Sequence, residues 1–243
     1  FSFIKSLLIF NYKLYNKLMT HDLSNYWKLY NNEKKQLLKK VINFNNKNKF
    51  NFLENENYNH IRDILSLTLS NIKFEKKKAK ILDYGSNLLT ISNLVNKINI
   101  SKFNFVIYDP FLDSKQKKYN LKNINYKLVN DYKKIIKDQF TLINFGSSIQ
   151  YQHNFFTNFE QFNLSRTKFI VFTSTPFSLS KTYISKQSNH TNLMQKVYSF
   201  DYVVKKFKSK KFNLIFKSRN DDRYIACKKK IHKTFSLNLV FKK

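Results

Sequence analysis

From residue 80 onward, short apolar runs alternate with stretches of helical periodicity, and this alternation constrains the fold more than any other feature. The runs are Lys80–Tyr84, Phe103–Tyr108, Asn125–Val129, Phe140–Phe145, Lys168–Thr173, Phe212–Lys217, Arg223–Cys227 and Leu237–Phe241. Such alternation predicts an α/β fold, with a mostly parallel sheet and helices on both of its faces. The last three runs leave little room for helices between them, which predicts an antiparallel end to the sheet.

The first two runs form one unit with a turn and two acidic residues. The first run predicts a buried strand that brings Asp83 and Gly85 to a turn. Residues 88–98 predict a helix, and the second run predicts a strand that ends at Asp109. Gly85 is one of only two glycines, so this turn has a local geometric need for it. An acidic residue at the end of the second strand suits the two hydroxyls of a ribose.

The first third of the chain has a different character. Residues 1 to about 75 show apolar spacing typical of helices, so the 243 residues are predicted to divide into a helical N-terminal extension (1–75) and a sheet domain (76–243). The apolar stretch Phe1–Phe10 is too short to span a bilayer. We therefore expect a cytoplasmic protein without a transmembrane segment, with an optional membrane-interface contact through the first helix.

The formal net charge of +30 comes from 45 Lys+Arg against 15 Asp+Glu, and only four of the basic residues are arginines. The scarcity of Arg, Gly, Ala and Pro, beside abundant Lys, Asn, Ile and Phe, indicates an AT-rich genome. The charge predicts salt-dependent, non-specific attraction to anionic surfaces. Lysine lacks the bidentate fork of arginine, so no specific nucleic-acid partner is predicted. The single cysteine, Cys227, and five scattered histidines predict no metal site.

Several short segments occur in a consistent order between about residue 60 and residue 243, together with Asp109. They are Ile81–Leu88, Phe145–Tyr151, Phe169–Phe177, Val197–Phe200 and Phe235–Phe241. This ordered set resembles the class I S-adenosylmethionine-dependent methyltransferases, and more narrowly a methyltransferase family found among bacterial surface-polysaccharide genes. The resemblance implies a Rossmann-like class I methyltransferase sheet, S-adenosylmethionine as cofactor and a small-molecule or carbohydrate acceptor.

The resemblance also implies which residues bind the cofactor. Asp83 would fix the turn near the methionine moiety, Asp109 would bind the ribose, and the residues after the third strand would contact the adenine. The full predicted set is Asp83, Gly85, Ser86, Asn87, Asp109, Asn130, Asp131, Gly146 and Ser147. Three of these carboxylates have plainer alternatives, because Asp83 and Asp131 suit helix caps and Asp109 suits a turn before Pro110.

Methyl transfer is an in-line displacement at an activated methyl group, so positioning supplies most of the catalysis. A base is needed only where the acceptor must lose a proton. Tyr151, His153 and Gln187 are candidates, because their loops are expected to overhang the carboxyl edge of the sheet.

The sequence departs from the family pattern at the glycine-rich turn, where Ser86 and Leu89 replace the small or glycine residues expected. This leaves open a protein that keeps the methyltransferase fold as an assembly partner without the cofactor. The charge leaves open a nucleic-acid methyltransferase, although residues 144–147 lack the Asn/Asp-Pro-Pro-aromatic run of amino-methylating enzymes. A nicotinamide oxidoreductase is disfavoured, since the G-x-G-x-x-G spacing is absent.

Overall fold

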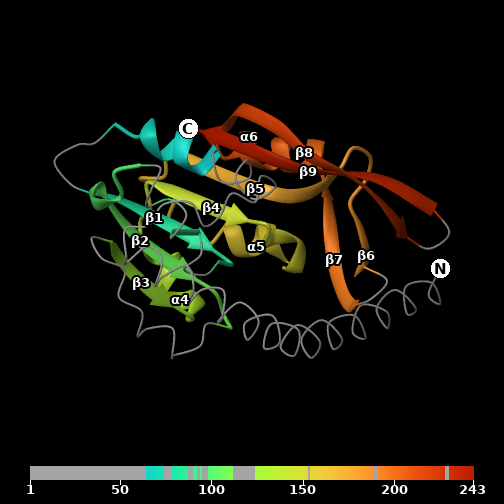
Figure 1. Cartoon of the computed structure of the whole chain (residues 1–243), viewed down its shortest axis with the longest axis horizontal. Helices are drawn as coiled ribbons and strands as arrows, with labels where there is room; N and C mark the ends of the chain where they lie inside the picture. The colour runs from blue at the N-terminus through green and yellow to red at the C-terminus, as the bar shows by residue number, and fades with distance from the viewer. Residues whose placement is uncertain are drawn as a thin grey trace, which may run out of the picture.

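The computed structural model describes residues 64–73, 78–86, 90–91, 94, 98–111, 124–152, 154–188, 191–227 and 230–243. Its elements are β1 (Ala79–Tyr84), η1 (Ile100–Lys102), β2 (Phe103–Tyr108), β3 (Asn125–Val129), α4 (Tyr132–Ile136), β4 (Leu142–Gly146), η3 (Ile149–Tyr151), α5 (Phe155–Phe159), β5 (Phe169–Ser178), β6 (Tyr183–Ser188), β7 (Thr191–Ser199), α6 (Phe200–Ser209), β8 (Asn213–Cys227) and β9 (Lys230–Lys242) (Figure 1).

Five parallel strands form the main sheet in the order β3-β2-β1-β4-β5 (Figure 1). After β1 the chain moves outward through β2 and β3 and then returns to β4 on the other side of β1, as in doubly wound sheets. Strand β9 adds antiparallel to β5, and β8 adds antiparallel to β9. The predicted fold class, a Rossmann-like and mostly parallel sheet with an antiparallel end, is confirmed.

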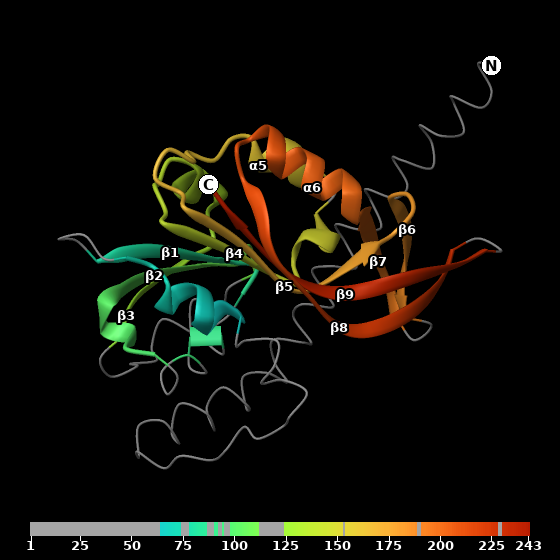
Figure 2. The ribbon, with the colours of Figure 1, turned by 90° about the horizontal axis from the view of Figure 1, so that it is seen from above.

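The two faces of the sheet bury different side chains because successive strand residues point to opposite faces. The face that carries α5 and α6 is aromatic (Figure 2). The ring of Phe172 lies at the centre of this face, and its centroid is 5.4 Å from the ring centroids of both Phe145 and Phe207. Each fully buried aromatic side chain contributes about 1.5–3 kcal/mol to the free energy of unfolding. The abundant phenylalanines therefore supply much of the stability of this layer.

Residues 64–70 are helical and pack on the opposite face. Leu65 and Leu69 are buried there in one cluster with Ile81 of β1 and Leu142 of β4. Of the helix predicted over 88–98, residues 90, 91 and 94 are helical, whereas residue 98 lies in a bend after the helix; the other residues of this range are not described. The rest of the N-terminal extension lies outside the described residues, and the domain boundary near residue 75 stays a prediction.

The strand predictions were wrong in two places. Strands β6 and β7 form an antiparallel hairpin between β5 and α6 that was not predicted. Its sequence is mostly Ser, Thr, Asn, Gln and Lys, so it lacks the apolar run by which the other strands were recognised. The two runs predicted near residues 212–217 and 223–227 belong to one strand, β8, because both pair continuously with β9 across two register shifts.

Candidate functional site

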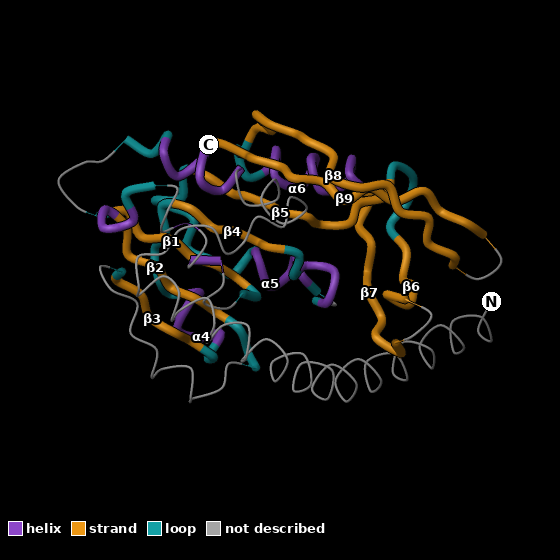
Figure 3. The backbone as a smooth tube through the Cα atoms, viewed as in Figure 1, coloured by secondary structure: helices purple, strands orange, loops and turns teal. Residues whose placement is uncertain are grey.

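The carboxyl ends of β1 and β4 lie side by side at the point where the strand order reverses (Figure 3). The pairing register matches Asp83 with Asn144 and Tyr84 with Phe145, and on the other side matches Tyr84 with Tyr108. Because the three strands end at the same level, the loops that follow β1, β2 and β4 meet at one edge. Ligands of open α/β sheets bind at such a switch point.

Asp83 and Asn144 form a buried polar pair at this point. Their side chains are 2% and 1% exposed, and Asn144 Nδ2 donates a hydrogen bond of 2.8 Å to Asp83 Oδ1. Asn144 Oδ1 is buried and takes no hydrogen bond among the described residues. Sequence reasoning missed Asn144, because one asparagine inside an apolar strand carries no recognisable signal. The pair holds one carboxylate oxygen in place and leaves an amide oxygen for a donor.

Gly85 is required by the approach of the loop after β4. Its φ of +68° is in the left-handed region, and a Cβ at this position would lie 2.3 Å from Ser148 Cβ. Its amide donates a hydrogen bond of 2.7 Å to the Tyr108 carbonyl, which ties the turn to the end of β2. The predicted need for a glycine at this turn therefore has a physical cause, since any larger residue would push apart the loops after β1 and β4.

The loop after β4 is tightly folded and holds polar atoms that have no partner among the described residues. Ser147 has a φ of 51°, and Gln150 Nε2 donates to both the carbonyl and the Oγ of Ser147, at 2.8 and 2.9 Å. Ser148 Oγ and Gln150 Oε1 are buried and take part in no hydrogen bond among the described residues. Buried polar atoms are nearly always satisfied in a native protein, so these atoms mark a place for water or a ligand.

Asp109 follows β2 directly and is half-buried. Its Oδ1 accepts a hydrogen bond of 2.7 Å from the Phe111 amide, which is the plainer turn role also considered for it. Within the described part of the chain, Oδ2 remains for a ligand. Burial raises the pKa of Asp109 to about 6, and the hydrogen bond from Phe111 only partly offsets this rise.

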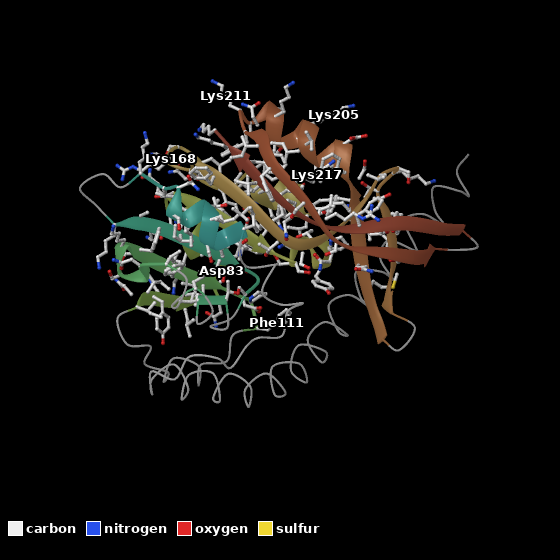
Figure 4. The ribbon with its side chains drawn as sticks, turned by 45° about the horizontal axis from the view of Figure 1, so that its top comes forward. Asp83, Phe111, Lys168, Lys205, Lys211 and Lys217 are labelled. Carbon is white, nitrogen blue, oxygen red and sulfur yellow. The ribbon has the colours of Figure 1, made fainter. Side chains whose placement is uncertain are left out.

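Phe111, 36% exposed, is a second residue that sequence reasoning missed. It lies on the same side of the molecule as Asp83 (Figure 4). An exposed aromatic ring two residues after a ribose-type carboxylate offers an apolar surface on which a nucleobase can stack.

The remaining predicted cofactor residues are placed as follows. Ser86 Oγ shares a hydrogen bond of 2.8 Å with Thr90 Oγ1, and Asn87 lies outside the described residues. Asp131 is the N-cap of α4, accepting a bond of 3.0 Å from the Lys133 amide, so the capping alternative is what the structure contains. Asn130 is exposed just before it. A contact of either residue with adenine stays a prediction.

The catalytic candidates are more scattered. Tyr151 ends η3 beside the site, whereas His153 lies outside the described residues. Gln187 was expected on a loop, but it lies within strand β6. The hairpin nevertheless contacts this edge, because Tyr198 of β7 donates a hydrogen bond of 3.2 Å to the carbonyl of Gln152, directly after η3.

The described residues contain neither a metal-binding cluster nor a membrane-spanning helix. These residues contain no group of three or more His, Cys, Asp or Glu side chains that could hold a metal ion. Among the same residues, no helix is long and apolar enough to cross a membrane. The prediction that the protein uses no metal stays a prediction.

Comparison with solved structures returns methyltransferases at low identity. The 1,6-didemethyltoxoflavin-N1-methyltransferase of Burkholderia thailandensis is 10% identical, with 87% of this chain and 89% of that chain covered and a TM-score of 0.47. The magnesium protoporphyrin IX methyltransferase of Synechocystis PCC 6803 is 7% identical, with 80% and 89% covered and a TM-score of 0.47. The 16S rRNA methylase ArmA is 16% identical, with 84% and 97% covered and a TM-score of 0.40.

No protein-family model and no curated protein sequence matches the chain. The identities and TM-scores of the solved structures are low, so these likenesses carry no part of the function proposed below. The chain has a Rossmann-like α/β sheet with buried polar side chains at the switch point between β1 and β4.

Proposed function

We propose that this protein is an S-adenosylmethionine-dependent methyltransferase that acts on a small molecule or carbohydrate. The observation that supports this most is Asp109, a half-buried carboxylate at the end of the strand next to the switch-point strand, with one oxygen left for a ligand. A carboxylate in this position accepts hydrogen bonds from two ribose hydroxyls, and such charge-assisted bonds are stronger than neutral ones.

The residues at the switch point between β1 and β4 fit the other parts of this cofactor. The buried oxygens Asn144 Oδ1, Ser148 Oγ and Gln150 Oε1 are acceptors that suit the ammonium group of its methionine moiety. Phe111 offers a ring for the adenine. The predicted set around the turn, Asp83 and Gly85 with Ser86, Asn87, Gly146 and Ser147, remains part of this proposal, as do Asn130 and Asp131 at the adenine end.

When bound, the cofactor would supply a methyl group on a sulfonium sulfur, to which an acceptor oxygen or nitrogen would bond in line as the S–C bond breaks and S-adenosylhomocysteine leaves. The protein's own contribution is to hold the two reactants in register and to exclude water. Tyr151 ends η3, in the segment that follows β4, and its phenol is a candidate for positioning the acceptor or for proton transfer. His153 and Gln187 stay weaker candidates for the same work.

The acceptor class rests on the hairpin. Strands β6 and β7 contribute buried neutral polar side chains, Ser185 and Gln195, which pair directly across the ladder. Ser185 Oγ takes no hydrogen bond among the described residues. Neutral hydroxyl and amide groups suit a polyhydroxylated acceptor better than a charged one. A role in surface-polysaccharide synthesis belongs to this proposal through the sequence resemblance alone. A cytoplasmic location belongs to it because the apolar stretch Phe1–Phe10 is too short to span a bilayer.

Calorimetric titration of S-adenosylmethionine and S-adenosylhomocysteine into the full chain tests the proposal. We expect micromolar binding that Asp109→Ala removes and that Asp201→Ala, an exposed acidic residue on α6, leaves unchanged. Equal binding by both variants would place the cofactor elsewhere. An absence of binding by folded wild-type protein would refute the enzyme and favour the second candidate.

That second candidate is a methyltransferase-fold partner protein without cofactor. It is favoured by Ser148, which fills the space in front of Gly85 where a cofactor would approach the turn. Ser148→Gly would enlarge this space. If the wild type does not bind the cofactor and this variant does, the Ser148 side chain blocks the cofactor site in the natural protein. If neither binds, the fold serves another purpose.

A further inference from the structure

Strand β8 is an edge strand, since among the described strands it pairs only with β9. Two large apolar side chains stand next to each other on it, Ile215 with 55% and Phe216 with 41% of its surface exposed. The ladder shifts register between Leu214 and Phe216, so Ile215 is the extra residue of a bulge. A bulge protects an edge from pairing with other strands, yet here it displays apolar side chains.

Lysines lie on the chain segments next to this pair. Asn213 pairs with Lys242 in the β8–β9 ladder, and the Lys243 amide donates a bond of 3.0 Å to the Lys168 carbonyl, so three chain segments meet here. Lys217 lies with its Nζ 5.0 Å from the centroid of Phe200, which links β8 to α6. We call this exposed set the basic rim: Lys168, Lys205, Lys208, Lys210, Lys211, Lys217, Lys242 and Lys243.

The basic rim carries far more positive than negative charge. Residues 164–169, 205–219 and 240–243, whose side chains are all described, contain lysines and arginines and no acidic residue, and Asp201 lies one turn before Lys205 on α6. The labelled lysines of the rim lie together along one side of the molecule, whereas Asp83 and Phe111 lie on another (Figure 4). A partner bound at the rim would therefore leave the side of the molecule that carries Phe111 uncovered.

We propose that the basic rim, with Ile215 and Phe216 at its centre, docks the protein on an anionic lipid surface. Lysines near such a surface each strengthen binding electrostatically, and exposed apolar side chains between them enter the boundary between headgroups and acyl chains. Nucleic acid fits the same charge less well. Of Ile215 and Phe216, only Phe216 offers a face for base stacking, and every basic side chain of the rim is a lysine, which lacks the planar fork that arginine uses on phosphates.

The test is sedimentation of the full chain with vesicles of phosphatidylcholine alone or with about 30% phosphatidylserine, at about 0.1 M salt. We expect binding to the anionic vesicles only. The variant Lys210→Gln/Lys211→Gln/Lys242→Gln should weaken it by about a hundredfold, at about fivefold for each lysine. The variant Ile215→Ser/Phe216→Ser, which keeps the charge, should weaken it by about tenfold.

A matched control removes the same charge from the far end of the sheet, where Lys127, Lys133 and Lys137 are exposed on β3 and at α4. Its Lys→Gln triple variant should weaken vesicle binding less than about threefold, because these lysines stand beyond the Debye length from the docked surface. If both triple variants lost the same amount of vesicle affinity, a defined docking surface would be refuted. The binding would then come from the net charge of the whole protein.

Two further outcomes would also overturn the proposal. If the rim variants bind vesicles as well as the wild type, another segment, such as the first helix, carries the contact. If the wild type does not bind vesicles, and the rim variants bind a labelled oligonucleotide more weakly than the wild type does, the surface is a nucleic-acid site. Circular dichroism of each variant confirms that it is folded before its binding is compared.

Discussion

Asp109→Asn is expected to stabilise the protein and to weaken cofactor binding at the same time. Burial raises the pKa of Asp109 from 3.8 to about 6. Between about pH 4 and pH 6 the folded protein therefore keeps a proton that the unfolded chain has released. The free energy of unfolding falls as the pH rises through this window and is constant above it. The buried carboxylate thus costs stability at neutral pH.

The magnitude follows from the size of the pKa shift. About two units correspond to about 3 kcal/mol, and water around a half-buried side chain reduces this to about 1–2 kcal/mol. Asparagine has nearly the same shape, and its Oδ1 can still accept the hydrogen bond from Phe111. At about pH 7.5 the variant should therefore unfold about 2–6 °C higher than the wild type. At about pH 4 most of this difference should vanish, because the folded wild-type carboxyl is then protonated.

Denaturant unfolding followed by circular dichroism at both pH values measures this effect, with the exposed Asp201→Asn as the control. Titration of S-adenosylmethionine into the same samples measures the second effect, the weaker cofactor binding. We expect the affinity of the Asp109→Asn variant to be at least about tenfold lower than that of the wild type. A variant that is less stable than wild type at neutral pH would refute the reasoning. The reasoning would also be refuted if the free energy of unfolding changed with pH in the same way for wild type and variant between about pH 4 and pH 6.

Three further substitutions test the local structure of the site. Gly85→Ala should destabilise the protein by about 2–4 kcal/mol, measured by denaturant unfolding, because its Cβ would meet Ser148 in a left-handed backbone conformation. Asn144→Ala should cost about 2–3 kcal/mol in the same assay, since the buried Asp83 loses a hydrogen-bond donor. Asp131→Ala should cost about 1 kcal/mol by removing the cap of α4, and thermal unfolding resolves this loss.

The changes at Gly85 and Asn144 each have a counterpart variant that separates the cause of the loss from general damage. Gly146→Ala places a Cβ 3.2 Å from Thr173 Oγ1, so it should cost less than the change at Gly85. Asn158→Ala, an amide on α5, should cost less than the change at Asn144. If Asp131→Ala leaves the stability unchanged but lowers cofactor affinity, its carboxylate serves the ligand and not the helix.

The main sheet could be predicted because its strands are apolar. Residues 79–84 and 103–108 are buried on both faces, and such strands appear in a sequence as continuous apolar runs. The hairpin of β6 and β7 could not be predicted in this way. It is attached through polar side chains, including the hydrogen bond between the hydroxyls of Tyr183 and Thr234, and the distance along the chain hides that pairing.

The site was predicted only in part for a similar reason. Gly85 could be recognised as a turn, but its close approach to Ser148 joins residues on two separate strands' loops and has no local sign. Asn144 acts through Asp83, which lies opposite it in the sheet register. Propensity and spacing describe neighbours along the chain, whereas both of these relations exist only after β1 and β4 have paired.

The position of β9 sets an order for folding. Strand β5 pairs with β4 and β7 along one edge, and its other edge is covered by β9, which follows it in the chain only after the hairpin, α6 and β8. During synthesis, β5 therefore emerges well before the strand that closes it. Until then its apolar edge can pair with another nascent chain. We therefore expect the nascent chain to be most prone to aggregation in the interval between the synthesis of β5 and that of β9.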